Sequence, residues 1–253
     1  RSRSVANIIE EMEYLCGLSR QPYVVFRDPM FTADRSRVED LCIAIIESRM
    51  RIRFECETRL DHLDEELLTL MHRAGLRTIT FGVESISPET LRKVARRPTP
   101  EAHQRLIVDK CRELGISTAG YYVFGFLPDT WNSIAATIDY SISLGTTYAQ
   151  FKILTPYPGT PLWKQFAPLV FETDWQKFDG YTTTFRHLNL TSDELRFLLG
   201  AAYARFYGRP SWAANYLRIN QRSIRKWVAR MDGKVSAAHS RKECQLMTRP
   251  VTC

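Results

Sequence analysis

Five short apolar segments alternate with amphipathic segments over the first 156 residues of the chain, and each is rich in β-branched and aromatic residues. They begin about 30 residues apart, which is the length of one strand–helix unit in a parallel sheet. The five candidate strands are 23–28, 52–59, 78–85, 117–125 and 148–156. Five such units in a row predict an α/β fold, either a doubly wound open sheet or a barrel.

The segments between the candidate strands have the period of amphipathic helices. The segment 38–50, for example, places its apolar residues on one face. Gly75, Gly115 and Gly145 each follow a helical pattern. Glycine adopts a left-handed C-terminal cap without a Cβ clash, so we expect a helix to end at each of them.

Two helix starts pair a capping hydroxyl with a proline, at Ser87-Pro88 and at Thr99-Pro100. A side chain of this type accepts from the first free backbone N–H groups, and proline suits the first helical position. Asp129 or Thr130 is expected to cap the helix that follows.

The pattern changes after Pro168. An aromatic, irregular stretch is followed by a capped amphipathic helix at 191–208 and a basic segment. The sequence therefore predicts three regions: a core over 1–167, a mostly helical extension over 168–230, and a basic, disordered tail over 231–253.

Composition and charge narrow the class of protein. The chain has 253 residues, 44% hydrophobic and 25% charged, as expected of a soluble globular protein. It has no apolar run of about 18 residues, so no transmembrane segment is expected. The stretch 218–253 holds nine Lys or Arg against two Asp or Glu and carries the whole formal charge of +7. Such a tail can contact nucleic acid or an anionic surface, but a solvated terminus is the simpler interpretation.

The six cysteines are spread along the chain, at Cys16, Cys42, Cys56, Cys111, Cys244 and Cys253. No two lie within four residues of each other, which excludes a local CxxC or CxxxCxxC metal motif. The sequence predicts free thiols, most of them buried, in a reducing cytoplasm.

Polar residues and glycines follow each candidate strand. In parallel α/β folds, ligands bind at the carboxyl ends of the strands, so these residues predict a site at that rim. They are Asp28, Glu57, Arg59, Glu84, Ser85, Gly125, Pro128, Pro156, Tyr157 and Gly159.

Several motifs in order resemble the core of radical S-adenosylmethionine (SAM) enzymes, in particular the subgroup that often carries an upstream cobalamin-binding domain. They are FRDPMFTAD, CETRLDHLDEELLTLMHRAGLRTITFGVESISPETLRKV, GYYVFGFLPDT and TPYPGTPLW, and they span residues 3–163. The stretch DWQKFDGYTTTFRHLNLT is similar to the C-terminal extension of that subgroup.

The resemblance implies a partial (β/α)6 TIM-like barrel whose strands two to six lie in 1–167, followed by the helical extension. The family's CxxxCxxC loop and first strand are missing from this sequence, which begins with Arg1. We therefore expect a C-terminal fragment, with the ligands of a [4Fe–4S] cluster upstream and any cobalamin domain further upstream. No metal ligands are expected within the chain itself, where His103 and His187 have no supporting pattern.

The resemblance also implies roles for the rim residues. Glu84 and Ser85 would bind the ribose hydroxyls or the ammonium of SAM, and Asp28 would accept from the ammonium. Arg59 would bind the SAM carboxylate. The alternatives are a Glu84–Arg59 salt bridge, a turn or helix-cap role for Asp28, and a structural ion pair for Arg59.

Two further candidates come from the later strands. Gly120 and Gly125 would let the adenine of SAM lie against backbone, and Tyr157 would line the substrate cavity. The alternatives are a bulge or tight turn at the glycines and loop packing for Tyr157.

The resemblance implies reductive SAM cleavage to a radical, with C-methylation or oxidative cyclisation of a small-molecule substrate. A flavodoxin- or ferredoxin-like electron donor is expected, and nucleic acid is not. Without cluster cysteines, the chain alone is expected to be inactive. The rival functions are a radical SAM methylthiotransferase acting on RNA, and a non-catalytic binding or scaffold subunit without a cluster.

Overall fold

The computed structural model describes residues 3–93, 96–218 and 221. The chain divides into two compact units, Arg1–Tyr207 and Gly208–Cys253. In the second unit, residues 210–218 are helical, and the rings of Trp212 and Tyr216 stack with their centroids 5.0 Å apart. The predicted tail over 231–253, with Cys244 and Cys253, lies outside the described residues.

The first unit is built on one sheet of five parallel strands in the order β1-β2-β3-β4-β5. Each predicted strand is confirmed, although the first is reduced to three residues. The strands are β1 (Tyr23–Val25), β2 (Arg53–Thr58), β3 (Leu76–Glu84), β4 (Ser117–Phe124) and β5 (Tyr148–Ile153).

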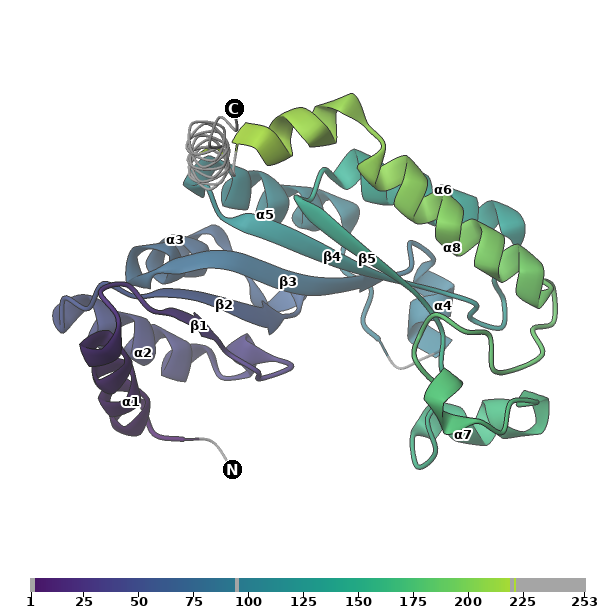
Figure 1. Ribbon diagram of the computed structural model, residues 1–253, viewed down its shortest axis with the longest axis horizontal. Coiled ribbons are helices and arrows are strands. Elements are labelled where there is room, and N and C mark those ends of the chain that lie inside the picture. Colours follow the sequence, from purple (N-terminus) through teal and green to yellow (C-terminus); the bar gives the residue numbers. More distant parts are fainter. Residues whose placement is uncertain (1–2, 94–95, 219–220, 222–253) are drawn as a thin grey trace, which may run out of the picture. The chain divides into compact units, whose positions relative to one another are not determined.

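Eight α-helices occur among the described residues of the first unit. They are α1 (Val5–Leu18), α2 (Arg35–Glu47), α3 (Glu65–Ala74), α4 (Pro88–Lys93), α5 (Glu101–Leu114), α6 (Trp131–Leu144), α7 (Pro161–Phe166) and α8 (Ser192–Tyr207). Helices α1, α2, α3, α5 and α6 contact one another in chain order, so they form one layer on one face of the sheet (Figure 1). A doubly wound sheet reverses its strand order and carries helices on both faces. The strictly sequential order and the single helical layer therefore identify a curled, partial α/β barrel.

Most of the predicted helix ends are confirmed. Gly75, Gly115 and Gly145 follow α3, α5 and α6 with φ angles of 120°, 72° and 71°. At the start of α6, Thr130 forms a capping box with Ser133.

The two Ser/Thr-Pro starts behave differently. The Ser87 Oγ accepts from Thr90 N at 3.1 Å and caps α4, as predicted. The prediction for Thr99 is wrong, because Pro100 is extended (φ −54°, ψ 140°) and is itself the N-cap, without a side-chain hydrogen bond. Thr99 instead accepts from Gln104 Nε2 through its carbonyl at 2.8 Å.

The two faces of the sheet differ in polarity. Side chains on the helix-covered face, such as Phe54, Phe81 and Phe151, are fully buried and form the core. The residues that alternate with them are partly exposed on the opposite face, here called the inner face. The inner face carries Glu55, Glu57, Thr78, Thr80, Tyr121, Gln150 and Lys152. A barrel interior with so many polar groups is suited to holding a polar ligand rather than a sealed core.

The outer edge of β5 is capped by the C-terminal part of the unit. Ile153 N donates to Gly180 O at 2.7 Å. The Tyr203 hydroxyl on α8 bonds both the N–H (3.2 Å) and the C=O (3.0 Å) of Phe151, and Tyr207 does the same for Ala149 (3.0 and 2.7 Å). On this side of β5, side-chain hydroxyls thus form the hydrogen bonds that the backbone of a further strand would otherwise form. Figure 1 shows α8 running beside α6 and β5.

The segment between β5 and α8 contains short helices and loops. An isolated antiparallel bridge joins Val170 and Phe185. Phe185 packs with Phe126, Leu154 and Phe166 in a buried cluster. Among the described residues, this extension contributes no further strand to the sheet, and no helix has the length and apolarity needed to cross a membrane.

Candidate functional site

The site is centred on Glu84, the last residue of β3. The register between β3 and β4 shifts between Gly82 and Glu84, as at a β-bulge. Glu84 has a φ of 64°, a left-handed conformation that is uncommon for a residue with a Cβ. The carboxylate turns back over Gly82, and Glu84 Oε1 occupies the space that a Cβ on Gly82 would need. The bulge and the glycine together place the carboxylate on the inner face.

The Glu84 carboxylate is largely withdrawn from water. Its side chain is 16% exposed, and its partner is the half-exposed Arg96, whose Nη2 lies 3.1 Å from Oε1. Burial raises the pKa of Glu84, with a smaller contribution from the negative charge of Glu57, while Arg96 opposes both. An acidic group of this kind, desolvated at a strand end, is a common feature of functional sites.

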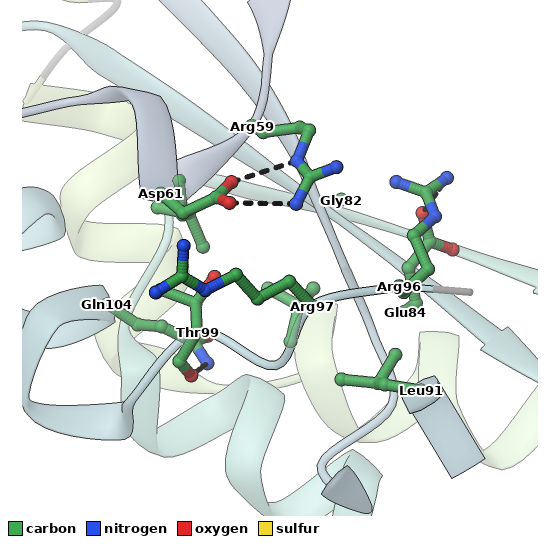
Figure 2. A pocket seen from close by; sticks show the side chains of 11 residues that line it. Arg59, Asp61, Gly82, Glu84, Leu91, Arg96, Arg97, Thr99 and Gln104 are labelled. Carbon is green, nitrogen blue, oxygen red and sulfur yellow. Dashed lines mark hydrogen bonds and ion pairs between the residues drawn. The ribbon is translucent and has the colours of Figure 1, made fainter. Parts of the chain in front are cut away.

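Arg59 does not pair with Glu84, so that predicted alternative is wrong. The Arg59 guanidinium instead forms a two-pronged ion pair with Asp61, at 2.8 Å from Nε and 2.7 Å from Nη2 (Figure 2). The structure therefore supports the structural ion pair for Arg59. Asp61 lies only two residues after Arg59 in the chain, so little chain entropy is lost when the two-pronged ion pair forms.

Glu84, Arg59 and Arg96 border one small cavity of about 30 Å³. Its remaining lining residues are Leu60, Asp61, Gly82, Val83, Leu91, Arg97, Thr99 and Gln104. A cavity of this size holds about one water molecule. A larger ligand that enters this cavity would displace Arg96, whose side chain is 45% exposed.

Ser85 and Asp28 lie apart from this cavity. Ser85 is buried, and its Oγ accepts from Ser87 N at 3.1 Å, so it belongs to the turn that leads into α4. Ser85 borders a neighbouring cavity of about 420 Å³ formed with α4 and α5. Asp28 borders a third cavity of about 380 Å³ between α1 and β1, on a different part of the unit. The structure thus brings together Arg59 and Glu84, but not Asp28.

Gly125 and Tyr157 have structural roles. Gly125 has a φ of 90° and donates to Asp129 Oδ2 at 2.9 Å, and a Cβ there would face Leu195 and Phe185. The tight-turn interpretation accounts for this glycine. The Tyr157 hydroxyl donates to Phe178 O at 2.9 Å, as expected of loop packing, and the residue is 49% exposed.

The inner face adds polar residues that the prediction from strand ends missed. The Tyr23 hydroxyl bonds Glu55 (3.0 Å) and Thr78 (3.1 Å) across three strands. Burial raises the pKa of Tyr121, and the nearby carboxylate of Glu57 adds to this. The signal was present in the sequence, because polar residues alternate with apolar ones in FECET and TITF.

The thiols that the structure describes do not form a metal site. Cys42, Cys56 and Cys111 are buried, and burial raises the pKa of Cys42 and Cys111 to about 12. His103 and His187 bond backbone carbonyl oxygens of Leu60 and Phe126. No group of three metal-ligating side chains occurs in the parts of the chain that the structure describes. An iron–sulfur cluster therefore does not fit the described residues of this chain.

The Glu84–Arg96 pair has the chemistry to bind an amino acid head group. A carboxylate beside a guanidinium complements an ammonium beside a carboxylate, because each ligand charge can replace one protein charge in the pair. SAM carries such a head group, so the residues around Glu84 fit this cofactor.

Known proteins resemble this chain in sequence and in fold. The model of the family described as "Radical SAM superfamily" matches residues 1–140. An "uncharacterized methyltransferase" of Pyrococcus horikoshii is 31% identical over 212 residues, covering 83% of this chain and 46% of that protein. An anaerobic magnesium-protoporphyrin IX monomethyl ester cyclase of Rubrivivax gelatinosus is 23% identical, covering 82% of this chain and 38% of that protein.

A solved structure shows the same fold. The radical SAM methyltransferase TsrM of Kitasatospora setae, with cobalamin and a [4Fe–4S] cluster bound, superimposes with a TM-score of 0.61 and 25% identity. The match covers 66% of this chain and 32% of that one. This chain thus spans less than half the length of each of these three proteins. The family model covers more than half of the chain, and the chain belongs to the radical SAM superfamily.

Proposed function

We propose that this chain is the SAM-binding barrel of a radical SAM enzyme that methylates a carbon or forms a ring by oxidative cyclisation. The observation that carries the proposal is the largely buried Glu84 carboxylate, turned over Gly82 onto the inner face beside Arg96. The similarity to a methyltransferase and to a cyclase supports these two reaction types.

In this proposal Glu84 and Arg96 bind the two ends of the SAM amino acid. Glu84 accepts from the ammonium or from the ribose hydroxyls, and the released Arg96 guanidinium binds the carboxylate. Arg96 takes the role expected of Arg59, because Arg59 already has both prongs occupied by Asp61. Ser85 contributes by fixing the turn after Glu84. Contacts of SAM with Asp28 and Gly125, and of the substrate with Tyr157, stay predictions.

The cofactors follow from family membership. SAM together with a reduced [4Fe–4S] cluster supplies the radical chemistry of this superfamily, while the protein binds, orients and excludes water. We propose that the cluster ligands lie outside this sequence, so that this chain alone is inactive. The cobalamin bound in TsrM makes cobalamin a candidate second cofactor. The electron donor and the cytoplasmic location stay predictions.

The rivals differ from the proposal in specific features. The methylthiotransferase rival predicts a small C-terminal β-domain, whereas the described extension is helical and irregular. The scaffold rival predicts that the residues around Glu84 bind no cofactor.

SAM binding by the intact, cluster-loaded enzyme tests the proposal. Glu84→Gln removes one charge-assisted hydrogen bond and is expected to weaken SAM binding by about 1.5–3 kcal/mol, roughly ten- to a hundred-fold. Glu89→Gln is the matched control, because Glu89 is an exposed carboxylate on the neighbouring α4 paired with Lys93. Equal SAM affinity for wild type and Glu84→Gln would overturn the proposed role of Glu84. No SAM binding by the wild-type enzyme would favour the scaffold.

A further inference from the structure

The inner face also carries a positively charged group, on the side away from Glu84. Lys152 lies on the inner face near the carboxyl end of β5, opposite Val123 of β4 in the ladder. Glu84 is opposite Tyr122, one residue earlier on β4. Glu84 and Lys152 therefore lie at nearly the same level, two strand spacings or about 10 Å apart along the sheet.

The surroundings of Lys152 hold its side chain in a defined place. Its Nζ lies 3.7 Å from the centroid of the Tyr181 ring and donates to Asp179 O at 3.4 Å. The Tyr181 hydroxyl in turn accepts from Gln150 Nε2 at 3.2 Å, which fixes the ring over β5. These contacts fix the ammonium as well as the aliphatic stem, whereas a surface lysine usually leaves its ammonium free in water.

The chain approaches Lys152 unusually closely at Gly180. A Cβ on Gly180 would lie 2.8 Å from Lys152 Cδ, and Gly180 has a φ of 80°. Its carbonyl accepts from Ile153 N in the β5 backbone at 2.7 Å. The glycine thus lets the segment pair with β5 while leaving room for the lysine stem.

The charge of Lys152 is not neutralised locally. In the part of the chain that the structure describes, no carboxylate lies within ion-pair distance of its Nζ, whereas Lys93, Lys110 and Lys177 each have one. The ammonium also lowers the pKa of Tyr181. A cation held in place without an anion, on the inner face of a barrel, is suited to binding an anionic ligand.

We propose that Lys152, held by Gly180 and Tyr181, anchors an acidic oxyanion of the substrate, a carboxylate or a phosphate, inside the partial barrel. The proposal rests on the proposed function, because it assumes that the substrate lies on the inner face beside SAM. The acidic side of the inner face, formed by β2 and β3 and including Glu84, then binds the amino acid head group of SAM. The side formed by β5 binds the acidic end of the substrate. The two sites are far enough apart for both ligands to bind.

Lysine footprinting on the full chain tests the proposal without knowledge of the substrate. An amine-reactive acetylating reagent is applied in chloride, inorganic phosphate or acetate at constant ionic strength, and the labelling rate of each lysine is measured by mass spectrometry. Lys164 on α7 is the matched control, because it is exposed. At about ten times its dissociation constant, a bound anion should lower the labelling rate of Lys152 roughly tenfold while Lys164 is unaffected.

The two anions distinguish the source of the negative charge. Protection by phosphate alone, by acetate alone, or by both supports an oxyanion site and identifies the group. If an anion protects Lys152 from labelling, Gly180→Ala should abolish that protection, because the added Cβ displaces the side chain of Lys152. Unchanged Lys152 labelling in both anions, or equal protection of Lys152 and Lys164, overturns the proposal. SAM binding by the intact enzyme is measured separately, so a failure of the anion site is distinguishable from a failure of the proposed function.

Discussion

Glu84 Oε1 lies too close to Gly82, two residues earlier in the same strand, to leave room for a Cβ there. The contact explains both unusual features of the strand end. The glycine provides the space, and the positive φ of Glu84 turns the side chain back toward it. A residue held in such a conformation needs support from its surroundings, and in this fold that support is at the candidate cofactor site.

Gly82→Ala should therefore impair the site and the fold together. The new methyl group pushes the Glu84 carboxylate away from the inner face, and overpacking of this kind costs about 1–3 kcal/mol of unfolding free energy. Denaturant unfolding of the variant and SAM binding by the intact enzyme measure the two effects. Gly200→Ala is the control, because nothing lies within 4 Å of its Cβ position on α8, so it should leave stability unchanged or raise it. Normal stability and SAM affinity in Gly82→Ala would show that the carboxylate relocates freely.

Removal of the charge at Arg96 and at Arg59 should have different effects on SAM affinity and on stability. In the intact enzyme, Arg96→Gln should weaken SAM binding by about 1.5–3 kcal/mol, because it removes the cation assigned to the SAM carboxylate. Arg59→Gln should leave SAM affinity nearly unchanged and lower stability, because Asp61 loses its bidentate partner. Equilibrium SAM binding and thermal unfolding of both variants decide the assignment. The reverse pattern would restore Arg59 as the SAM ligand.

The hydroxyl of Tyr203 should contribute measurably to the free energy of unfolding, although the residue is partly exposed. Tyr203→Phe leaves the N–H and C=O of Phe151 at the β5 edge without their partner, which typically costs about 1–3 kcal/mol. Unfolding free energy and hydrogen exchange at Phe151 are the measurements. Tyr14→Phe on the exposed face of α1 should have no effect. Unchanged exchange at Phe151 would mean that water replaces the hydroxyl at no cost.

Much of the fold could be predicted because it depends on local signals. Strand periodicity, the spacing of about 30 residues, and glycines such as Gly115 mark the strand–helix units within short windows. The Glu84–Arg96 pair could not be predicted in this way, because it joins a strand end to a loop residue and has no periodic signal. The Arg59–Asp61 pair was two residues apart in the sequence, yet nothing local showed that Asp61 rather than Glu84 would be the partner. The separation of Asp28 from the cavity at Glu84 could not be predicted either, because a strand end gives the level of a residue and not its position around the barrel.

The pKa of Asp129 gives a pH-dependent test of the loop after β4. Asp129 Oδ2 accepts from Gly125 N at 2.9 Å and Phe126 N at 3.0 Å. Burial nevertheless raises its pKa from 3.8 to about 6, because the two hydrogen bonds only partly offset the loss of hydration. The native state therefore binds this proton more tightly than the unfolded chain. The stabilisation is fully present below the unfolded pKa and is lost as the pH rises through about 6.

Asp129→Asn should remove this dependence while keeping the loop. One amide oxygen can accept from both N–H groups, and no charge is buried. Relative to wild type, the variant should gain unfolding free energy as the pH rises from about 4 to about 7, by up to about 3 kcal/mol. Urea unfolding of both proteins across this range gives the difference directly, because the contributions of all other groups cancel. A difference that stays constant, or that falls with rising pH, would mean that the two N–H groups stabilise the ionised carboxylate more than burial destabilises it.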